Sequence, residues 1–429
     1  MVKNTLHRQS LPGSDDISRY TLPNGITLLT RPNFNSPTVV CKGYLLAGSI
    51  ADSEDRLGLA YFTAAALMTG TKQRDFHTLY NTIESFGAHL FINGGTNTTS
   101  FSSQCLIEDL PAMLRILAEV LNEPSFPVKQ FNRLKAQMLT LLTIRAQNTA
   151  QMAAMTFDQL IYKNHPYERP DEGYPETVQA IEIDDLKEFH QNNFGPKGMV
   201  ISIVGAIEPE EAITQVTETL GAWSNPLQHE PNMLPELEPL THSVKQHISI
   251  PGKSQTDLVM GTVGPSRLSD DYLACAVGNN ILGQFGMMGR IGNAVRERAG
   301  LAYYAQTQLN SGIGPGAWEI VAGVNPINLD KTIELIKNEV KRFIEKPVTE
   351  EELDDTKSFI IGRLPISLES NSGVAVSLLN LERFNLGLDY LRRYDDMIQS
   401  ISAEQILTSA RKYLSLDRLA MATAGTISK

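Results

Sequence analysis

The sequence of 429 residues is poor in cysteine, in positive charge and in long apolar runs. Its three cysteines, Cys41, Cys105 and Cys275, are odd in number and far apart, so they form neither a CxxC metal clip nor a disulfide framework. This usage favours a reducing compartment. No stretch approaches the ~20 apolar residues of a membrane span, and the first residues do not resemble a signal peptide. We therefore expect a cytoplasmic protein with no membrane partner.

The charge balance also excludes one class of partner. The chain has 37 Lys and Arg residues against 48 Asp and Glu residues, which gives a formal net charge of −11. Proteins that bind nucleic acid usually cluster Lys and Arg against the phosphates, so no nucleic-acid partner is expected. A hydrophobic content of 42% and a charged content of 20% are typical of a folded globular chain with about two to three domains.

An internal repeat is the clearest feature of the organisation. The segment Asp184–Ile207 aligns without a gap to Glu404–Ile427, so that Gly205 meets Gly425 at an offset of 220 residues. Each copy has an acidic start, a helical pattern, an aromatic residue and a short apolar strand before the glycine. The repeat predicts that two copies of one fold make up the chain.

The segment 225–242 separates the copies, because it carries four prolines and little periodic apolar pattern. We predict a domain over residues 1–224, a linker over 225–242 and a second domain over 243–429. Short strands alternate with long helices, which favours an α+β fold of two homologous domains, each a mainly antiparallel sheet flanked by helices. The predicted strands are Ile26–Thr30, Val39–Leu46, His89–Ile92, Thr98–Cys105 and Leu258–Thr262, and the predicted long helices are Leu110–Leu121 and Phe131–Gln147.

Two segments of the first half carry a family resemblance. Tyr20–Leu29 (YTLPNGITLL) is similar to the opening hairpin, and Gly58–Thr71 (GLAYFTAAALMTGT) to the zinc helix, of the pitrilysin/insulinase/mitochondrial-processing-peptidase family of inverted-zincin metallopeptidases. The similarity covers nearly the whole chain. It implies that the two domains form half of a clamshell.

The zinc motif of that family is absent. Active members carry HxxEH, in which two histidines bind zinc and the glutamate activates water. The corresponding positions are Tyr61, Ala64 and Ala65, and a phenol with two methyl groups cannot replace these ligands. The family's third ligand, a glutamate on a later helix, falls near 137–144, where no Asp or Glu occurs. The alternative is an ordinary amphipathic helix that never carried the motif.

A second motif of the family is retained. Gly289–Tyr304 resembles the C-terminal pattern of Arg-Glu followed by Gly-Leu-x-Tyr. The resemblance assigns to Arg296 and Tyr303 the binding of substrate carbonyls and of the oxyanion, for which a guanidinium and a phenol supply donors. The alternative is structural: Arg296 caps a helix or pairs with a surface carboxylate, and Tyr303 packs beside a strand.

Two glycine-rich segments need separate interpretations. Gly283–Arg290 lacks the Gly-Lys-Ser/Thr ending of a phosphate loop, so we predict a tight turn before the helix with Arg296. Gly87–Gly95 resembles the family's edge strand, to which a substrate peptide can add as a further strand. Gly94 and Gly95 are expected to weaken or widen that edge, which puts peptide docking there in doubt.

The absence of the zinc motif and the retention of the Arg/Tyr motif suggest an enzyme whose active site is shared between two subunits. The first hypothesis is a heterodimer in which this chain, inactive alone, binds small or unfolded peptide substrates while a homologous HxxEH-bearing subunit supplies zinc. The second hypothesis is a structural or peptide-binding scaffold without proteolytic role. A third is a self-associating peptide-binding protein without a catalytic partner.

Overall fold

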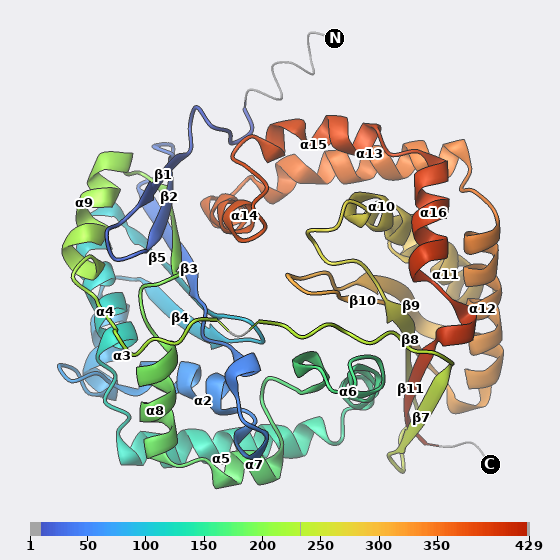
Figure 1. The fold of residues 1–429 in the computed structure, drawn as a ribbon, viewed down its shortest axis with the longest axis horizontal. Coiled ribbons are helices and arrows are strands. Elements are labelled where there is room, and N and C mark those ends of the chain that lie inside the picture. The colour runs from blue at the N-terminus through green and yellow to red at the C-terminus, as the bar shows by residue number, and fades with distance from the viewer. Residues whose placement is uncertain (1–9, 232, 427–429) are drawn as a thin grey trace. The chain divides into compact units, whose positions relative to one another are not determined.

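The structure is a computed structural model that describes residues 10–231 and 233–426 (Figure 1). Its chain divides into two compact units, each assembled from three segments. The first comprises Met1–Leu142, Pro170–Met233 and Pro365–Arg393, and the second comprises Thr143–Arg169, Leu234–Leu364 and Tyr394–Lys429. No helix of the described part of the chain is long and apolar enough to cross a membrane.

The first unit is built on a sheet of six strands within the described residues, in the order β1-β2-β6-β3-β5-β4. Only the pair β2 and β6 is parallel. The strands are β1 (Ser18–Thr21), β2 (Thr27–Pro32), β3 (Thr38–Leu45), β4 (His89–Gly94), β5 (Thr99–Leu106) and β6 (Val200–Gly205). The helices are α2 (Leu59–Ala66), α3 (Phe76–Ser85), α4 (Leu110–Asn122), α5 (Val128–Arg145), α7 (Pro175–Ala180), α8 (Ile183–Asn193), α9 (Pro209–Leu220) and α14 (Asn371–Arg383).

The second unit repeats this plan with the order β7-β11-β8-β10-β9, in which only β7 and β11 run parallel. Its strands are β7 (Val244–Ser249), β8 (Thr256–Val263), β9 (Ala302–Leu309), β10 (Ala317–Val324) and β11 (Ala420–Gly425). Its helices are α6 (Thr149–Ile161), α10 (Tyr272–Gly283), α11 (Phe285–Gly292), a π-helix at Asn293–Arg298, α12 (Leu329–Glu345) and α16 (Ala403–Tyr413). Two further helices, α13 (Glu350–Ser367) and α15 (Tyr390–Gln399), contribute residues to both units.

Each core lies between a sheet and its helices. On α4, buried apolar residues recur every three to four positions, which gives the helix one apolar face toward the sheet. Phe62 on α2 stacks on Phe131 of α5 at 5.1 Å between ring centroids. In the second unit the fully buried Trp318 donates from Nε1 to Asn279 at 3.0 Å. The predicted fold class, α+β with two homologous and mainly antiparallel sheets, is confirmed.

The predicted repeat is also confirmed. The helices α8 and α16 begin and end 220 residues apart, and so do the strands β6 and β11. The strands end at Gly205 and Gly425, which both have φ of +147°. Residues other than glycine rarely adopt this backbone conformation. Ile427, the last residue of the predicted repeat, lies outside the described residues. Residues 225–231 and 233–242, in the predicted linker, form neither helix nor strand.

One helix of each unit comes from a distant part of the chain. In the first unit, α14 packs on β3 and β6, and Arg19 of β1 makes two hydrogen bonds to Glu382 of α14, at 2.8 and 2.7 Å. In the second unit, α6 packs on β8 and β11 (Figure 1). Phe157 and Ile161 of α6 are buried there. Each sheet therefore completes its core with a helix taken from outside its main segment.

A buried carboxylate fastens the start of α6. Asp257 of β8 is 1% exposed and accepts hydrogen bonds from Thr149 Oγ1 at 2.5 Å, Tyr304 OH at 2.5 Å and Gln255 Nε2 at 2.8 Å. Burial raises the pKa of Tyr304, and so does its bond to Asp257. Side chains from three chain segments therefore meet at one carboxylate.

We expect Asp257→Ala to destabilise the second unit by about 3 kcal/mol, because three partly buried donors lose their shared, buried carboxylate acceptor. Tyr304→Phe removes one donor and is expected to cost about 1 kcal/mol. Urea unfolding followed by tryptophan fluorescence would report on this unit in a Trp223→Phe background, because Trp223 lies in the first unit and Trp318 in the second. A cost for Asp257→Ala no larger than that for Tyr304→Phe would contradict this role of the carboxylate.

Candidate functional site

Helix α2, which carries the three positions of the family's zinc motif, is held at its N-terminus by a buried acid. Gly58 precedes the helix with φ of +96°, a left-handed conformation that glycine adopts without strain. The carboxylate of Asp52 accepts hydrogen bonds from the backbone nitrogens of Gly58 and Ala60, both at 2.9 Å. Asp52 thereby binds amide groups that a helix start otherwise leaves without partners.

The motif positions themselves face a close packing partner. Ala64 is fully buried, whereas Tyr61 and Ala65 are partly buried. A Cβ added at Gly94 of β4 would lie 2.8 Å from Cα of Tyr61 and 3.2 Å from Cβ of Ala64. The absence of a side chain at Gly94 therefore lets β4 approach this face of α2.

Gly94 and Gly95 do not widen the edge strand, contrary to the sequence-based expectation. Gly94 pairs with Thr99 in register, and the nitrogen of Gly95 donates to the Thr98 carbonyl at 3.0 Å. The pairing is made by backbone groups and does not need a side chain at either glycine.

The side chains near α2 do not fit a zinc ion. The segment 137–144, where the family places its third ligand, lies on α5, whose charged residues are all Lys or Arg. Across residues 10–231 and 233–426, no group of three or more His, Cys, Asp or Glu side chains is arranged to hold a metal ion. The chemistry of a zinc-bound water therefore cannot be derived from this chain's own residues.

Two acids that the sequence analysis passed over lie near Tyr61. Burial raises the pKa of Tyr61, and the charges of Glu172 and Asp171 raise it further. Asp171 accepts hydrogen bonds from Ser49 Oγ at 2.5 Å and from Thr96 Oγ1 at 3.1 Å, and burial raises its pKa despite them. Asp171 thus fastens the loop between β4 and β5.

Arg296, the first retained residue, lies on the π-helix that continues α11. Its side chain is 35% exposed, and its Nη1 lies 3.8 Å from Oε1 of Glu297. After Arg296 the chain reverses at Gly300, with φ of +63°, whose nitrogen donates to the Arg296 carbonyl at 3.1 Å. This turn leads directly into β9.

The predicted tight turn before Arg296 is wrong, because residues 285–292 form the helix α11. Sequence reasoning took the three glycines as a turn signal. The structure accommodates them within the helical segment, where Gly286, Met288 and Gly289 have positive φ values of 60°, 75° and 63°. A left-handed conformation is common for glycine but costs energy at Met288.

Tyr303, the second retained residue, lies on β9, the strand at the edge of its sheet. Its side chain is 73% exposed, so little of it packs against the neighbouring strand or the core. The next residue, Tyr304, instead bonds to the buried Asp257. Within the described ranges, the side chains of Arg296 and Tyr303 make no hydrogen bond. Arg296 does pair with a surface carboxylate, that of Glu297, but at 3.8 Å, so donors of both side chains are available to a ligand.

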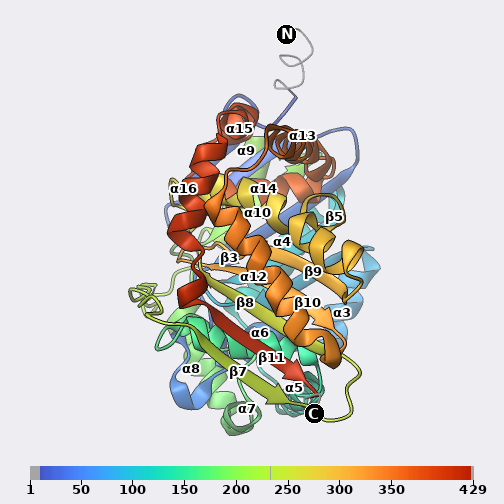
Figure 2. The same ribbon diagram turned by 90° about the vertical axis from the view of Figure 1, so that its right-hand side faces the viewer.

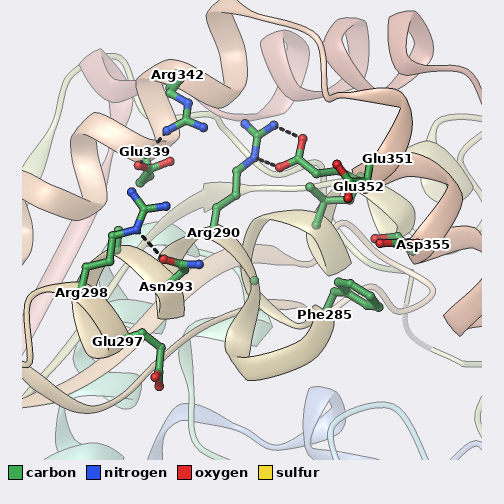
Figure 3. A pocket seen from close by; sticks show the side chains of 14 residues that line it. Phe285, Arg290, Asn293, Glu297, Arg298, Glu339, Arg342, Glu351, Glu352 and Asp355 are labelled. Atoms are coloured by element: carbon green, nitrogen blue, oxygen red, sulfur yellow. Dashed lines mark hydrogen bonds and ion pairs between the residues drawn. The ribbon is translucent and has the colours of Figure 1, made fainter.

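A charged pocket of about 360 Å³ lies beside the π-helix (Figure 3). Arg290 of α11 makes two hydrogen bonds of 2.6 Å to Glu352 of α13 across it. Burial raises the pKa of Glu352, but the hydrogen bonds from Arg290 and Thr349 lower it by more, to about 2. Arg298 is bonded to Asn293 at 2.7 Å. The Arg290–Glu352 pair ties α11, which the π-helix continues, to α13, whereas the Arg298 bond stays within the π-helix.

The sequence matches two models of one peptidase family. Residues 29–171 match "Insulinase (Peptidase family M16)", and residues 180–359 match "Peptidase M16 inactive domain". A Helicobacter pylori protein named "Non-peptidase homolog YmxG" is 26% identical over 87% of this chain and 86% of its own. The "Mitochondrial-processing peptidase subunit beta" of Lentinula edodes is 22% identical over 95% of this chain and 89% of its own.

Solved structures agree with the sequence matches. The "peptidase M16 inactive domain" from Pseudomonas fluorescens superposes with a TM-score of 0.90 at 25% identity, covering 96% of this chain and 98% of that one. A protease from Helicobacter pylori has the same fold, with a TM-score of 0.88 at 17% identity and coverage of 96% and 100%. Together with the motif positions Tyr61, Ala64 and Ala65, these matches show that the chain belongs to peptidase family M16, the insulinase family, as a member that lacks the family's zinc motif.

Proposed function

We propose that this chain is the zinc-free, substrate-binding subunit of a heterodimeric zinc metalloendopeptidase that cleaves small or unfolded peptides. The observation that carries the proposal is the exposure of Arg296 and Tyr303, without hydrogen-bond partners in the described residues, in a chain without the zinc motif. The names of two relatives support it, since one is called a non-peptidase homolog and another a subunit. The partner would be a homologous HxxEH-bearing chain in the cytoplasm.

The two side chains suit the stabilisation of a peptide during cleavage. Zinc held by the partner would activate the attacking water. Arg296 offers several N–H donors in a fixed plane, and the Tyr303 phenol offers one more. Donors aimed at a carbonyl oxygen stabilise the negative charge that develops on it, most strongly where water is excluded. In this proposal the chain orients the peptide and binds the oxyanion.

The test is hydrolysis of a quenched unstructured peptide, with zinc present, by this chain, by its HxxEH-bearing homologue and by their mixture. Only the mixture is expected to be active. Arg296→Ala and Tyr303→Phe are each expected to lower kcat/KM by about 100-fold, the usual cost of an oxyanion donor. Association of the chains, measured by light scattering, should not change.

Arg298→Ala is the matched control, because Arg298 lies on the same π-helix but is bonded to Asn293. We expect near-normal activity from this variant. Hydrolysis by this chain alone would refute the proposal. A mixture that forms a complex but cleaves nothing would favour the scaffold alternative, and loss of activity with Arg298→Ala would show that the helix, not Arg296, matters.

A further inference from the structure

A second pocket, of about 600 Å³, lies in the second unit on one face of β7 and β11. Lys245 and His247 of β7 pair in register with Met421 and Thr423 of β11, and all four line the pocket. The alternate residues of β11 pack instead in the cluster that contains α6. Figure 2 shows β7 and β11 beside α12, with α6 behind them. The pocket therefore occupies the part of the sheet face next to the start of α12.

The wall opposite the strands is apolar. Pro326 and Ile327 come from the short 3-10 helix Pro326–Asn328, and Leu329 and Ile333 come from the first turns of α12. Ile327 is 77% exposed, although a large aliphatic side chain gains about 1.5–3 kcal/mol when it is buried. The pocket combines this apolar wall with polar side chains of the strands and Asp330, a mixture that suits a small ligand with one apolar and one polar end.

The polar groups of the pocket favour an anion. Lys245 is exposed and makes no ion pair within the described residues. Nδ1 of His247 lies 2.8 Å from Thr423 Oγ1, whereas its Nε2 is buried and has no hydrogen-bond partner there. An unpaired buried nitrogen is costly, and an acceptor oxygen would satisfy it if it carries the proton. Asp330 of α12 also lines the pocket and would repel an anion near it, so a carboxylate would have to bind on the strand side, beside Lys245.

We propose that this pocket binds an aliphatic chain that ends in a single carboxylate. The chain would lie against Ile327, Ile333 and Met421, and the carboxylate would bind Lys245 and His247. A free medium-chain acid and a peptide with an apolar C-terminal residue share this chemistry. The inference does not depend on the proposed peptidase complex, because every residue involved lies in the second unit of this chain.

The test is titration of the full chain with sodium octanoate, followed by the NMR signal of the ¹³C-labelled Met421 methyl group, which Met421→Leu would assign. We expect saturable binding of octanoate, binding at least tenfold weaker for octanol, and none for octylamine. Lys245→Met should weaken octanoate binding about tenfold, the effect of one charge-assisted contact, and leave octanol binding unchanged. Ile327→Ser should weaken both.

Lys346→Met is the control, since Lys346 is an exposed lysine at the other end of α12. It should bind octanoate like the unmodified chain, and thermal melting would verify that each variant is folded. Acetyl-Ala-Leu-Leu as the free acid and as the amide separates the two sources: binding of the acid alone indicates a peptide ligand, and no binding of either indicates a free acid. Absence of saturable octanoate binding, or equal affinity after Lys245→Met, would overturn the inference.

Discussion

Fragments of the chain divided at residue 232 are expected to be unfolded or aggregated alone and to regain structure when mixed. The fragment 1–231 lacks α14, which covers β3 and β6, and the fragment 233–429 lacks α6, which covers β8 and β11. Residue 232 lies in the predicted linker 225–242. The experiment therefore also tests the proposal that residues 1–224 and 243–429 are the domains of this chain.

The size of the effect follows from the buried side chains of each missing helix. On α14, the residues Val374, Leu378 and Leu381 are each at most 3% exposed. At about 2 kcal/mol for each such side chain, their loss removes about 6 kcal/mol. The net stability of a domain is only about 5–15 kcal/mol. The loss of Phe157 and Ile161 on α6 acts in the same way on the other fragment.

Far-UV circular dichroism and size-exclusion chromatography would measure the result for each fragment and for the mixture. A synthetic peptide of residues 365–393 is the control, since it should restore the fold of fragment 1–231 without the rest of the chain. The same peptide with Leu378→Asp and Leu381→Asp should not. If fragment 1–231 is monomeric and melts cooperatively by itself, α14 is dispensable for that unit.

The exchange of these helices could not be predicted from the sequence. The apolar residues Phe157 and Ile161 show that α6 needs an apolar surface, but periodicity does not say which sheet supplies it. The repeat, by contrast, was predictable because its helix, strand and final glycine recur in one alignment. Both sheets offer a similar apolar face, so the sequence pattern of a helix does not show which sheet it covers. Only the three-dimensional packing assigns each helix to its sheet.

The candidate site shows a similar division. The loss of the zinc motif at Tyr61, Ala64 and Ala65 was evident from residue types alone, because no packing turns a methyl group into a ligand. The role of Gly94 was not evident from the sequence. Gly94 allows α2 to approach β4 closely, and this contact joins residues that are far apart in the sequence. The roles of Arg296 and Tyr303 rest on a motif, and their exposure is a three-dimensional property that the motif does not contain.

Buried acids were also missed, and Glu319 is the one with the largest consequence. It lies on β10, is 8% exposed and accepts a hydrogen bond from Asn310 Nδ2 at 2.9 Å. Burial raises its pKa from 4.5 to about 7, although the bond from Asn310 works in the other direction. The charge of Glu319 in turn contributes to the raised pKa of Tyr162, whose main cause is burial.

A raised pKa makes the folded state bind the proton more tightly than the unfolded state does. The stabilisation is complete below pH 4.5 and is lost as the pH rises toward about 7, so the free energy of unfolding falls over that range. Glu319→Gln cannot ionise and avoids this loss. Relative to the unmodified chain, the variant should therefore gain about 2 kcal/mol in stability between pH 5 and pH 8.

Urea unfolding at pH 5 and pH 8 would measure this gain from the difference between the two chains at each pH. Any constant cost of burying the extra amide N–H groups cancels in that comparison, because it is the same at both values. Glu334→Gln, at an exposed position of α12, should show no such change with pH. A gain for Glu319→Gln that is equal at pH 5 and pH 8 would mean that Glu319 ionises in the folded protein as readily as in the unfolded chain.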